Sequence, residues 1–146
     1  MEKNLPALVA LLFAFGVVIT DGNLFQLQKM IKEATGKQAI PNYSSYGCHC
    51  GLGGKGKPLD DTDWCCHYHD CCYEKMENQG CKPKTVSYSY SYLSGNMNCG
   101  GGTSCEQQVC ECDRNLAMCL KKHLGSYSWK LRFYWNIFCS NSAPEC

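Results

Sequence analysis

Three stretches of the chain have the apolar spacing of an α-helix. In residues 23–35, apolar side chains recur every three or four residues and so occupy one helical face. They are Leu24, Leu27, Ile31 and Ala34. Gly36 follows directly and predicts the end of the helix. We expect this stripe to pack into the core; the alternative is that it lines a mouth for an apolar substrate, or lies on a membrane together with Phe25.

The second helical stretch covers residues 59–78, with three capping residues near its start and Gly80 after its end. Two sets of side chains recur at i, i+4 and i+7, and each set shares a face. The first set is Cys65, His69 and Cys72; the second, about 100° further round the helix, is Cys66, Asp70 and Tyr73. The histidine and the aspartate are therefore held on a helix that cysteines fix on two sides.

The third helical stretch, residues 106–124, has Gly125 as its predicted stop. It carries a cysteine pair with the same i, i+7 spacing, so the two helices can be cross-linked side by side. An antiparallel arrangement pairs Cys65 with Cys119 and Cys72 with Cys112. On that register His69 lies level with position 115, and Asp113 is only about 3 Å away along the axis. The histidine then has a carboxylate partner.

Between these helices, residues 85–98 alternate strictly between serine and larger side chains, which is typical of a strand. Gly95 predicts the turn of a two-stranded hairpin. Such a small sheet needs support, and three cysteines flank it: Cys81, Cys99 and Cys105.

The segment of residues 41–57 has no helical period and contains five glycines, pinned by Cys48 and Cys50. A glycine-rich segment is often a mere connector. This one runs into the helix that carries Asp70, and it can turn several carbonyls toward a cation. Carboxylates and backbone carbonyls are the ligands of calcium. The EF-hand pattern is absent, because the required glycine does not follow the acidic residues.

Length and composition indicate a secreted single domain. The chain has 146 residues, enough for one domain. Residues 1–22 are typical of a secretory signal, with Lys3, an apolar run over residues 8–19 and a predicted cut ahead of Asn23. A retained membrane anchor is the alternative, but the apolar run is short for a span.

All fourteen cysteines follow the predicted cut, and their even number indicates a disulfide scaffold. A zinc site was the competing interpretation of the Cys/His cluster around His49; an oxidising compartment and paired cysteines argue against it. The leader holds one base and two acids, so the net charge of +1 becomes +2 without it. That charge gives no support to nucleic acid as a partner.

Three linked motifs resemble those of a secreted phospholipase A2, and the spacing and terminal cysteine resemble its group II branch. The motifs, which read YGCHCGLGG, CCHYHDCCY and CECD, begin at Tyr46, Cys65 and Cys110. The resemblance covers residues 23–146. It implies a mainly α, disulfide-rich fold with two long antiparallel cross-linked helices, an N-terminal helix, a calcium-binding loop and a small two-stranded β-wing. The implied disulfides are Cys48–Cys139, Cys50–Cys66, Cys65–Cys119, Cys71–Cys146, Cys72–Cys112, Cys81–Cys105 and Cys99–Cys110.

The resemblance also implies calcium-dependent hydrolysis of the sn-2 ester of glycerophospholipids. His69 corresponds to the general base that activates water, and Asp113 to its partner, braced by Tyr73 and Tyr88. Calcium ligands would be the Asp70 carboxylate and the carbonyls of His49, Gly51 and Gly53. The Gly51 N–H would also hold the oxyanion. Substrate contacts would come from Leu24, Leu27, Ile31 and Lys84, although Leu27 replaces a common aromatic residue.

Several positions have two interpretations. We expect His67 at the surface. The aromatic run of residues 129–135 is expected to pack beneath the C-terminal disulfide; alternatively, Trp129 or Trp135 inserts among lipid headgroups, and the same ambiguity holds for Trp64. Asn42 begins a glycosylation sequon, whose occupancy the sequence leaves open.

The expected partner is a phospholipid membrane or lipoprotein surface, bound peripherally by a monomer. A different class of function is a disulfide-stapled ligand for a receptor or proteoglycan. A pore-forming toxin is a third class, which the low net charge and the intact Asp70 disfavour. Headgroup and acyl-chain preference do not follow from the sequence.

Overall fold

The computed structural model describes residues 22–146, so the predicted leader lies outside the described residues apart from Gly22. The cut ahead of Asn23 stays a prediction. The longer elements are α1 (Gly22–Thr35), α2 (Ala39–Asn42), α3 (Asp61–Asn78), β1 (Tyr90–Leu93), β2 (Asn96–Cys99) and α4 (Ser104–Lys122). Four 3₁₀ turns complete the described part: η1 (Pro83–Thr85), η2 (Leu124–Ser126), η3 (Trp129–Leu131) and η4 (Asn136–Phe138). The predicted fold class is confirmed.

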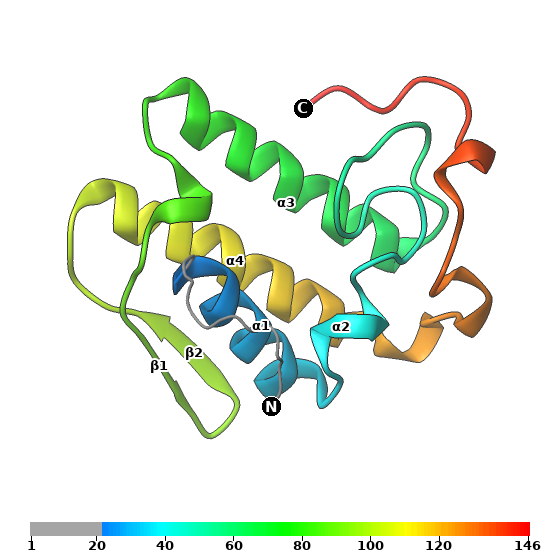
Figure 1. The fold of residues 1–146 in the computed structure, drawn as a ribbon. Coiled ribbons are helices and arrows are strands. Elements are labelled where there is room, and N and C mark those ends of the chain that lie inside the picture. Colours follow the sequence, from blue (N-terminus) through cyan, green and yellow to red (C-terminus); the bar gives the residue numbers. More distant parts are fainter. Residues whose placement is uncertain (1–21) are drawn as a thin grey trace, which may run out of the picture.

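The two long helices α3 and α4 form the centre of the molecule and run side by side (Figure 1). The disulfides Cys65–Cys119 and Cys72–Cys112 join them, each with a Cα separation of 5.8 Å. These are the two cross-links that the cysteine spacing predicts for an antiparallel pair. The register of the helices is therefore fixed at two points seven residues apart.

Local capping explains where these helices begin. The Asp60 carboxylate accepts the N–H of Asp63 and starts α3. Thr103 and Glu106 form a reciprocal capping box, so α4 starts two residues before the predicted boundary. The predicted stop at Gly125 is wrong: α4 ends at Lys122, and the chain continues into η2.

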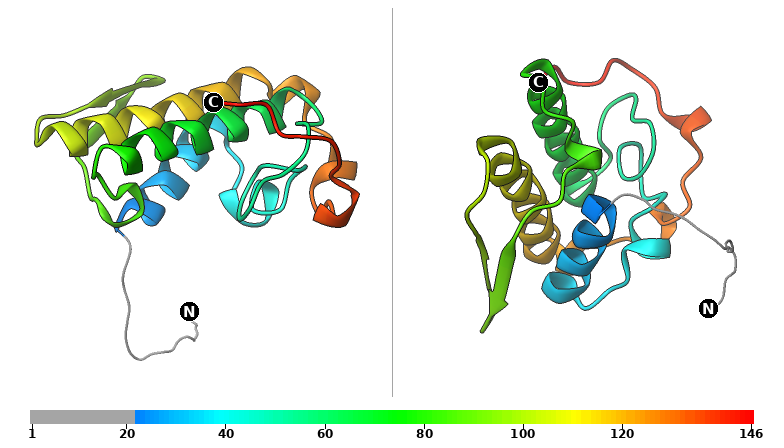
Figure 2. Two further views of the ribbon diagram at one scale, coloured as in Figure 1. Left: turned by 90° about the horizontal axis from the view of Figure 1, so that it is seen from above. Right: turned by 60° about the vertical axis from the view of Figure 1, so that its left-hand side comes forward.

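Helix α1 packs against α4 (Figure 2). It contributes side chains to two apolar clusters. Ile31 belongs to the cluster that includes Cys65 of α3. Leu27 is partly buried and packs against the same cluster. Met30, which the predicted stripe omits, is fully buried in the other cluster beside Tyr88. Leu24 at the start of the helix is exposed. The stripe thus runs from solvent into the core.

The predicted hairpin is present, with its turn at Ser94 and Gly95, both of which have positive φ. Glycine relieves the strain of that conformation. The strands are shorter than the alternating run, because pairing begins only at Tyr90, which faces Cys99. The Tyr90 hydroxyl donates to Glu33 of α1 at 2.7 Å and ties the hairpin to that helix.

All fourteen cysteines are paired, in the seven combinations that the resemblance implies. Because the cysteines around His49 are among them, no thiolate is left there for zinc. Among residues 22–146, no helix has the length and apolar character needed to cross a bilayer.

Candidate active site

The register of α3 and α4 brings His69 against Asp113. The ring nitrogen Nε2 of His69 lies 2.8 Å from Oδ1 of Asp113, and Asp113 is fully buried. The predicted juxtaposition of this histidine and its carboxylate partner is confirmed. Since a carboxylate accepts hydrogen bonds, Nε2 carries the proton of this bond. The other nitrogen, Nδ1, is left with a lone pair that can take a proton.

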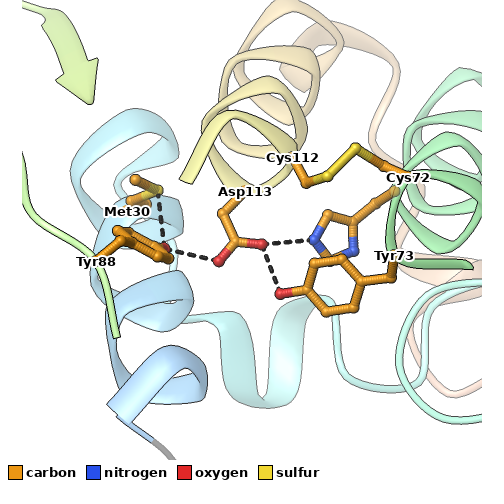
Figure 3. A network of polar contacts seen from close by, with 7 residues as sticks. Met30, Cys72, Tyr73, Tyr88, Cys112 and Asp113 are labelled. Carbon is orange, nitrogen blue, oxygen red and sulfur yellow. Dashed lines mark hydrogen bonds and ion pairs between the residues drawn. A yellow bond between two sulfur atoms is a disulfide. The ribbon is translucent and has the colours of Figure 1, made fainter. Parts of the chain in front are cut away.

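Two tyrosine hydroxyls also donate to Asp113 (Figure 3). Tyr73 reaches Oδ1 at 2.7 Å and Tyr88 reaches Oδ2 at 2.6 Å. Burial and the adjacent Asp113 charge raise the pKa of Tyr88 far above its ordinary value. Tyr88 therefore stays protonated and acts only as a donor toward Asp113. The carboxylate is held in place from both sides.

Tyr88 is itself fixed from α1. The Gln26 side chain accepts the backbone N–H of Tyr88 at 3.1 Å and donates to the Tyr88 carbonyl. The N-terminal helix is thus connected to the His69–Asp113 pair through one tyrosine. Sequence reasoning missed Gln26, because its partner lies 62 residues away and only the tertiary fold brings them together.

Asp70, next to His69, faces the glycine-rich segment. A Cβ atom on Gly54 would lie 3.3 Å from Oδ2 of Asp70 and 3.1 Å from Nδ1 of His49, and Gly54 has a φ of 125°. A side chain at position 54 would therefore crowd the space in front of the carboxylate. The segment forms a cradle that only glycine leaves open.

Within residues 22–146, the Asp70 carboxylate receives no hydrogen bond and forms no ion pair. Burial raises its pKa from 3.8 to about 6, against the opposing effects of His69, His49 and Lys84. A half-buried carboxylate without a cation is costly. A carboxylate that faces a glycine-rich segment, whose backbone can offer carbonyl oxygens, fits a hard cation such as calcium.

His49 is held by its ring as well as by its backbone. Its Nε2 lies 2.8 Å from the Gly56 carbonyl, so the imidazole ring connects position 49 to the last glycine of the segment. The buried carboxylate of Asp63 contacts the His49 backbone N–H, not the ring. His49 and Asp63 are thus structural partners of the loop and do not form a second histidine–carboxylate pair of the His69 kind.

The expectation that His67 lies at the surface is wrong. It is 6% exposed, and its ring lies 4.9 Å from that of His49 and 5.6 Å from that of Trp64. Burial and the neighbouring His49 lower its pKa. Its side chain therefore packs as a neutral ring under the loop.

The predicted substrate contacts occupy different surroundings. Leu24 is exposed, Leu27 half-buried and Ile31 buried, whereas Lys84 is exposed in η1 and close enough to Asp70 to lower its pKa. A cavity of about 240 Å³ touches His69 from between α3 and α4. Its lining residues are Cys65, Tyr68, His69, Cys72, Cys112, Asn115, Leu116 and Cys119. This cavity does not include the predicted acyl-chain residues.

The expected packing of the C-terminal aromatic run is wrong for most of its large side chains. Trp129, Phe133 and Trp135 are exposed, and so are Ile137 and Phe138 in η4. Trp135 and Phe138 stack with nearly parallel rings. The Cys48–Cys139 disulfide ties the residue after η4 to the glycine segment, and a Cβ atom on Gly53 would lie 3.5 Å from Nδ2 of Asn136. The exposed side chains of η4 therefore lie beside the glycine segment.

Comparison with known proteins agrees with this geometry. A family model described as phospholipase A2 matches residues 24–132. The chain belongs to the phospholipase A2 family. Proteins of Homo sapiens and Mus musculus, both called group IID secretory phospholipase A2, are 47% and 49% identical to it; each alignment covers 98% of this chain and 99% of the relative. The basic phospholipase A2 Cll-N6 of Crotalus lepidus lepidus is 52% identical over 89% of this chain and 93% of its own.

Membership of the phospholipase A2 family makes the chain a hydrolase of the secreted, disulfide-bonded kind. Seven disulfides are consistent with an oxidising, extracellular location. Because all its cysteines are paired, none of them can act as a thiol nucleophile.

Proposed function

We propose that this phospholipase A2 is a calcium-dependent enzyme that hydrolyses the sn-2 ester of glycerophospholipids. The observation that supports this most directly is the contact between His69 Nε2 and Asp113 Oδ1, beside the Asp70 carboxylate that has no partner among the described residues. In this proposal His69 is a general base with a fixed tautomer, and the adjacent Asp70 is a cation ligand.

The proton transfers follow from the His69 tautomer. Nδ1 takes a proton from a water molecule as the water oxygen bonds to the ester carbonyl carbon, and Asp113 stabilises the imidazolium that forms. The imidazolium then returns the proton to the departing glycerol oxygen as the ester C–O bond breaks. The products are a free fatty acid and a lysophospholipid. Tyr73 and Tyr88 keep Asp113 in place during both steps.

Calcium would be held by the Asp70 carboxylate and the backbone carbonyls of His49, Gly51 and Gly53. When bound, it supplies a positive charge that polarises the ester carbonyl and attracts the phosphate. The Gly51 N–H, which has no acceptor within the described residues, is proposed to donate to the developing oxyanion. The exposed ammonium of Lys84 is proposed to contact the substrate phosphate.

The partner of this enzyme is proposed to be the surface of a membrane or a lipoprotein. Large apolar side chains are exposed at the start of α1, on the glycine segment and in η4. Leu24, Leu27 and Ile31 lead from this exposed face toward the core, and they are proposed to receive the acyl chain. Binding as a monomer, and binding to a receptor or proteoglycan, remain predictions that rest on the sequence.

A vesicle assay tests the proposal. Phosphatidylcholine vesicles with different labelled acyl chains at sn-1 and sn-2 are incubated with the secreted protein, with calcium or with EGTA. We expect release of the sn-2 chain alone, and only with calcium. His69→Gln should lower turnover by at least about 10²-fold, the range of general-base catalysis. Release in EGTA, or release of the sn-1 chain, would contradict the proposal.

A further inference from the structure

The side chain of Asp63 has an unusual position for an acidic residue. It is fully buried, and no cation pairs with it within residues 22–146. It does not cap its own helix, because Asp60 accepts the Asp63 N–H at the start of α3. A buried charge without a counter-ion persists only where hydrogen bonds compensate it.

Three backbone N–H groups supply that compensation. Oδ2 of Asp63 accepts from Cys48 at 2.8 Å and from Leu59 at 2.9 Å, and Oδ1 accepts from His49 at 2.8 Å. Cys48 and His49 precede the last four glycines of the segment, and Leu59 follows the last of them. The Asp63 carboxylate therefore holds together the two ends of the loop that runs from Cys48 to Leu59.

The close approach depends on Gly47. A Cβ atom at this position would lie 2.5 Å from Cγ of Asp63 and 2.6 Å from its Oδ2, so any other residue would push the carboxylate away. Gly47 also has a φ of 62°, a conformation that side chains rarely adopt. The loop entrance and Asp63 are thus fitted to each other.

We propose that Asp63 is a positioning residue that preorganises the glycine segment for calcium before the ion arrives. The His49 carbonyl, a proposed ligand, belongs to the residue whose N–H Asp63 fixes, and the His49 ring braces the same loop at the Gly56 carbonyl. A loop that is already ordered loses less conformational entropy when it binds an ion. The inference rests on the proposed calcium dependence.

The primary test is the calcium affinity of Asp63→Asn, measured by isothermal titration calorimetry. An amide cannot replace a carboxylate here, because its NH₂ group would face backbone donors. Changes to residues behind metal ligands typically weaken metal binding by about 10–100-fold, and we expect a loss in that range. Asp61→Asn is the matched control: it removes the same charge from the same helical turn, but Asp61 contacts His123 and not the loop.

Two further readouts separate positioning from a general structural role. Hydrogen exchange without calcium should be faster in residues 47–59 of Asp63→Asn, with α4 unchanged. Turnover of Asp63→Asn at saturating calcium should return to within about threefold of wild type, because a preorganisation defect is overcome by mass action. Turnover that stays low at saturating calcium would overturn the inference.

The outcomes distinguish the inference from the proposed function. If the wild type binds no calcium, the proposed function fails, and the inference fails with it. If the wild type binds calcium but Asp63→Asn binds it equally well, only the inference is overturned. Should Asp63→Asn not fold, Gly47→Ala provides the same displacement from the other side; a folded Gly47→Ala with wild-type calcium affinity would also overturn it.

Discussion

The Tyr88 hydroxyl donates to Oδ2 of Asp113 at 2.6 Å, while Gln26 of α1 holds the backbone of the same tyrosine. Three segments that are distant in sequence therefore meet at one buried carboxylate. Asp113 comes from α4, Tyr88 from the segment before β1, and Gln26 from the N-terminal helix. The position of the His69 ring depends on all three.

Tyr88→Phe should affect both stability and turnover. Hydrogen bonds to charged groups contribute about 1.5–3 kcal/mol, so the free energy of unfolding should fall by about that amount in urea titrations. Turnover of a monomeric short-chain substrate should fall by roughly tenfold, because Asp113 is held less firmly. The control is Tyr92→Phe, whose hydroxyl bonds an exposed carbonyl of Glu33. Equal stability and turnover in Tyr88→Phe and wild type would contradict this role.

The pKa of Asp70 predicts how calcium binding depends on pH. Burial raises this pKa to about 6, and calcium binds the ionised carboxylate. The affinity should therefore be constant near pH 7.5 and fall by up to tenfold for each pH unit below about 6. Titration calorimetry at pH 5, 6 and 7.5 measures this. An affinity that is unchanged down to pH 5 would contradict this prediction.

The same raised pKa predicts the stability of the calcium-free protein. The folded state binds the Asp70 proton more tightly than the unfolded state does, so the stabilising contribution is present below pH 3.8 and is lost as the pH rises through about 6. Asp70→Asn removes the ionised carboxylate. Its melting temperature in EGTA should exceed that of wild type at pH 7.5 and approach it at pH 4. A lower melting temperature at pH 7.5 would contradict this.

Much of the site could be predicted because disulfides fix distances that sequence alone leaves free. Two cysteine pairs with i, i+7 spacing determine the direction and register of α3 and α4, and that register determines which residue faces His69. This register places Asp113 within side-chain reach of His69, so the hydrogen bond between them could be predicted. Capping residues predict the helix ends less well: the capping box at Thr103 starts α4 at Ser104, before the predicted boundary at Glu106.

The errors have a common physical origin in tertiary packing. His67 is polar and lies beside exposed Tyr68, yet the loop folds over it and buries it. Conversely, Trp135 is strongly apolar, but no other element covers η4 among the described residues. Local periodicity cannot report what a distant segment covers. For the same reason the sequence did not predict the role of Asp63, whose hydrogen-bond partners lie up to 15 residues away.

The sequon at Asn42 is predicted to have a structural role. Its Nδ2 donates to the Gln38 carbonyl at 2.7 Å, and its Oδ1 accepts from Arg132. Asn42→Ala should therefore lower the free energy of unfolding by about 1–3 kcal/mol, the cost of unmade hydrogen bonds. Ser44→Ala destroys the sequon without removing these bonds and should leave stability unchanged. Equal losses in the two variants would point to a glycan as the stabilising group.

The exposed side chains of η4 are predicted to anchor the enzyme on lipid. Trp135 is 67% exposed and Phe138 61%, and both lie beside the glycine segment, where Leu52 is 89% exposed. Aromatic rings favour the headgroup region of a bilayer. Since burying one large apolar side chain contributes about 1.5–3 kcal/mol, changing both Trp135 and Phe138 to alanine should weaken binding to phosphatidylcholine vesicles by at least tenfold.

Vesicle sedimentation measures this binding, and hydrolysis of a monomeric short-chain substrate should stay within about twofold of wild type. Leu93→Ala is the control, because Leu93 is at least as exposed but ends β1 in the hairpin, on the other side of the molecule from η4 (Figure 1). With a net charge of only +2 after the predicted cut, wild type should prefer phosphatidylglycerol over phosphatidylcholine only mildly. Unchanged binding of the double variant would show that η4 does not contact the lipid.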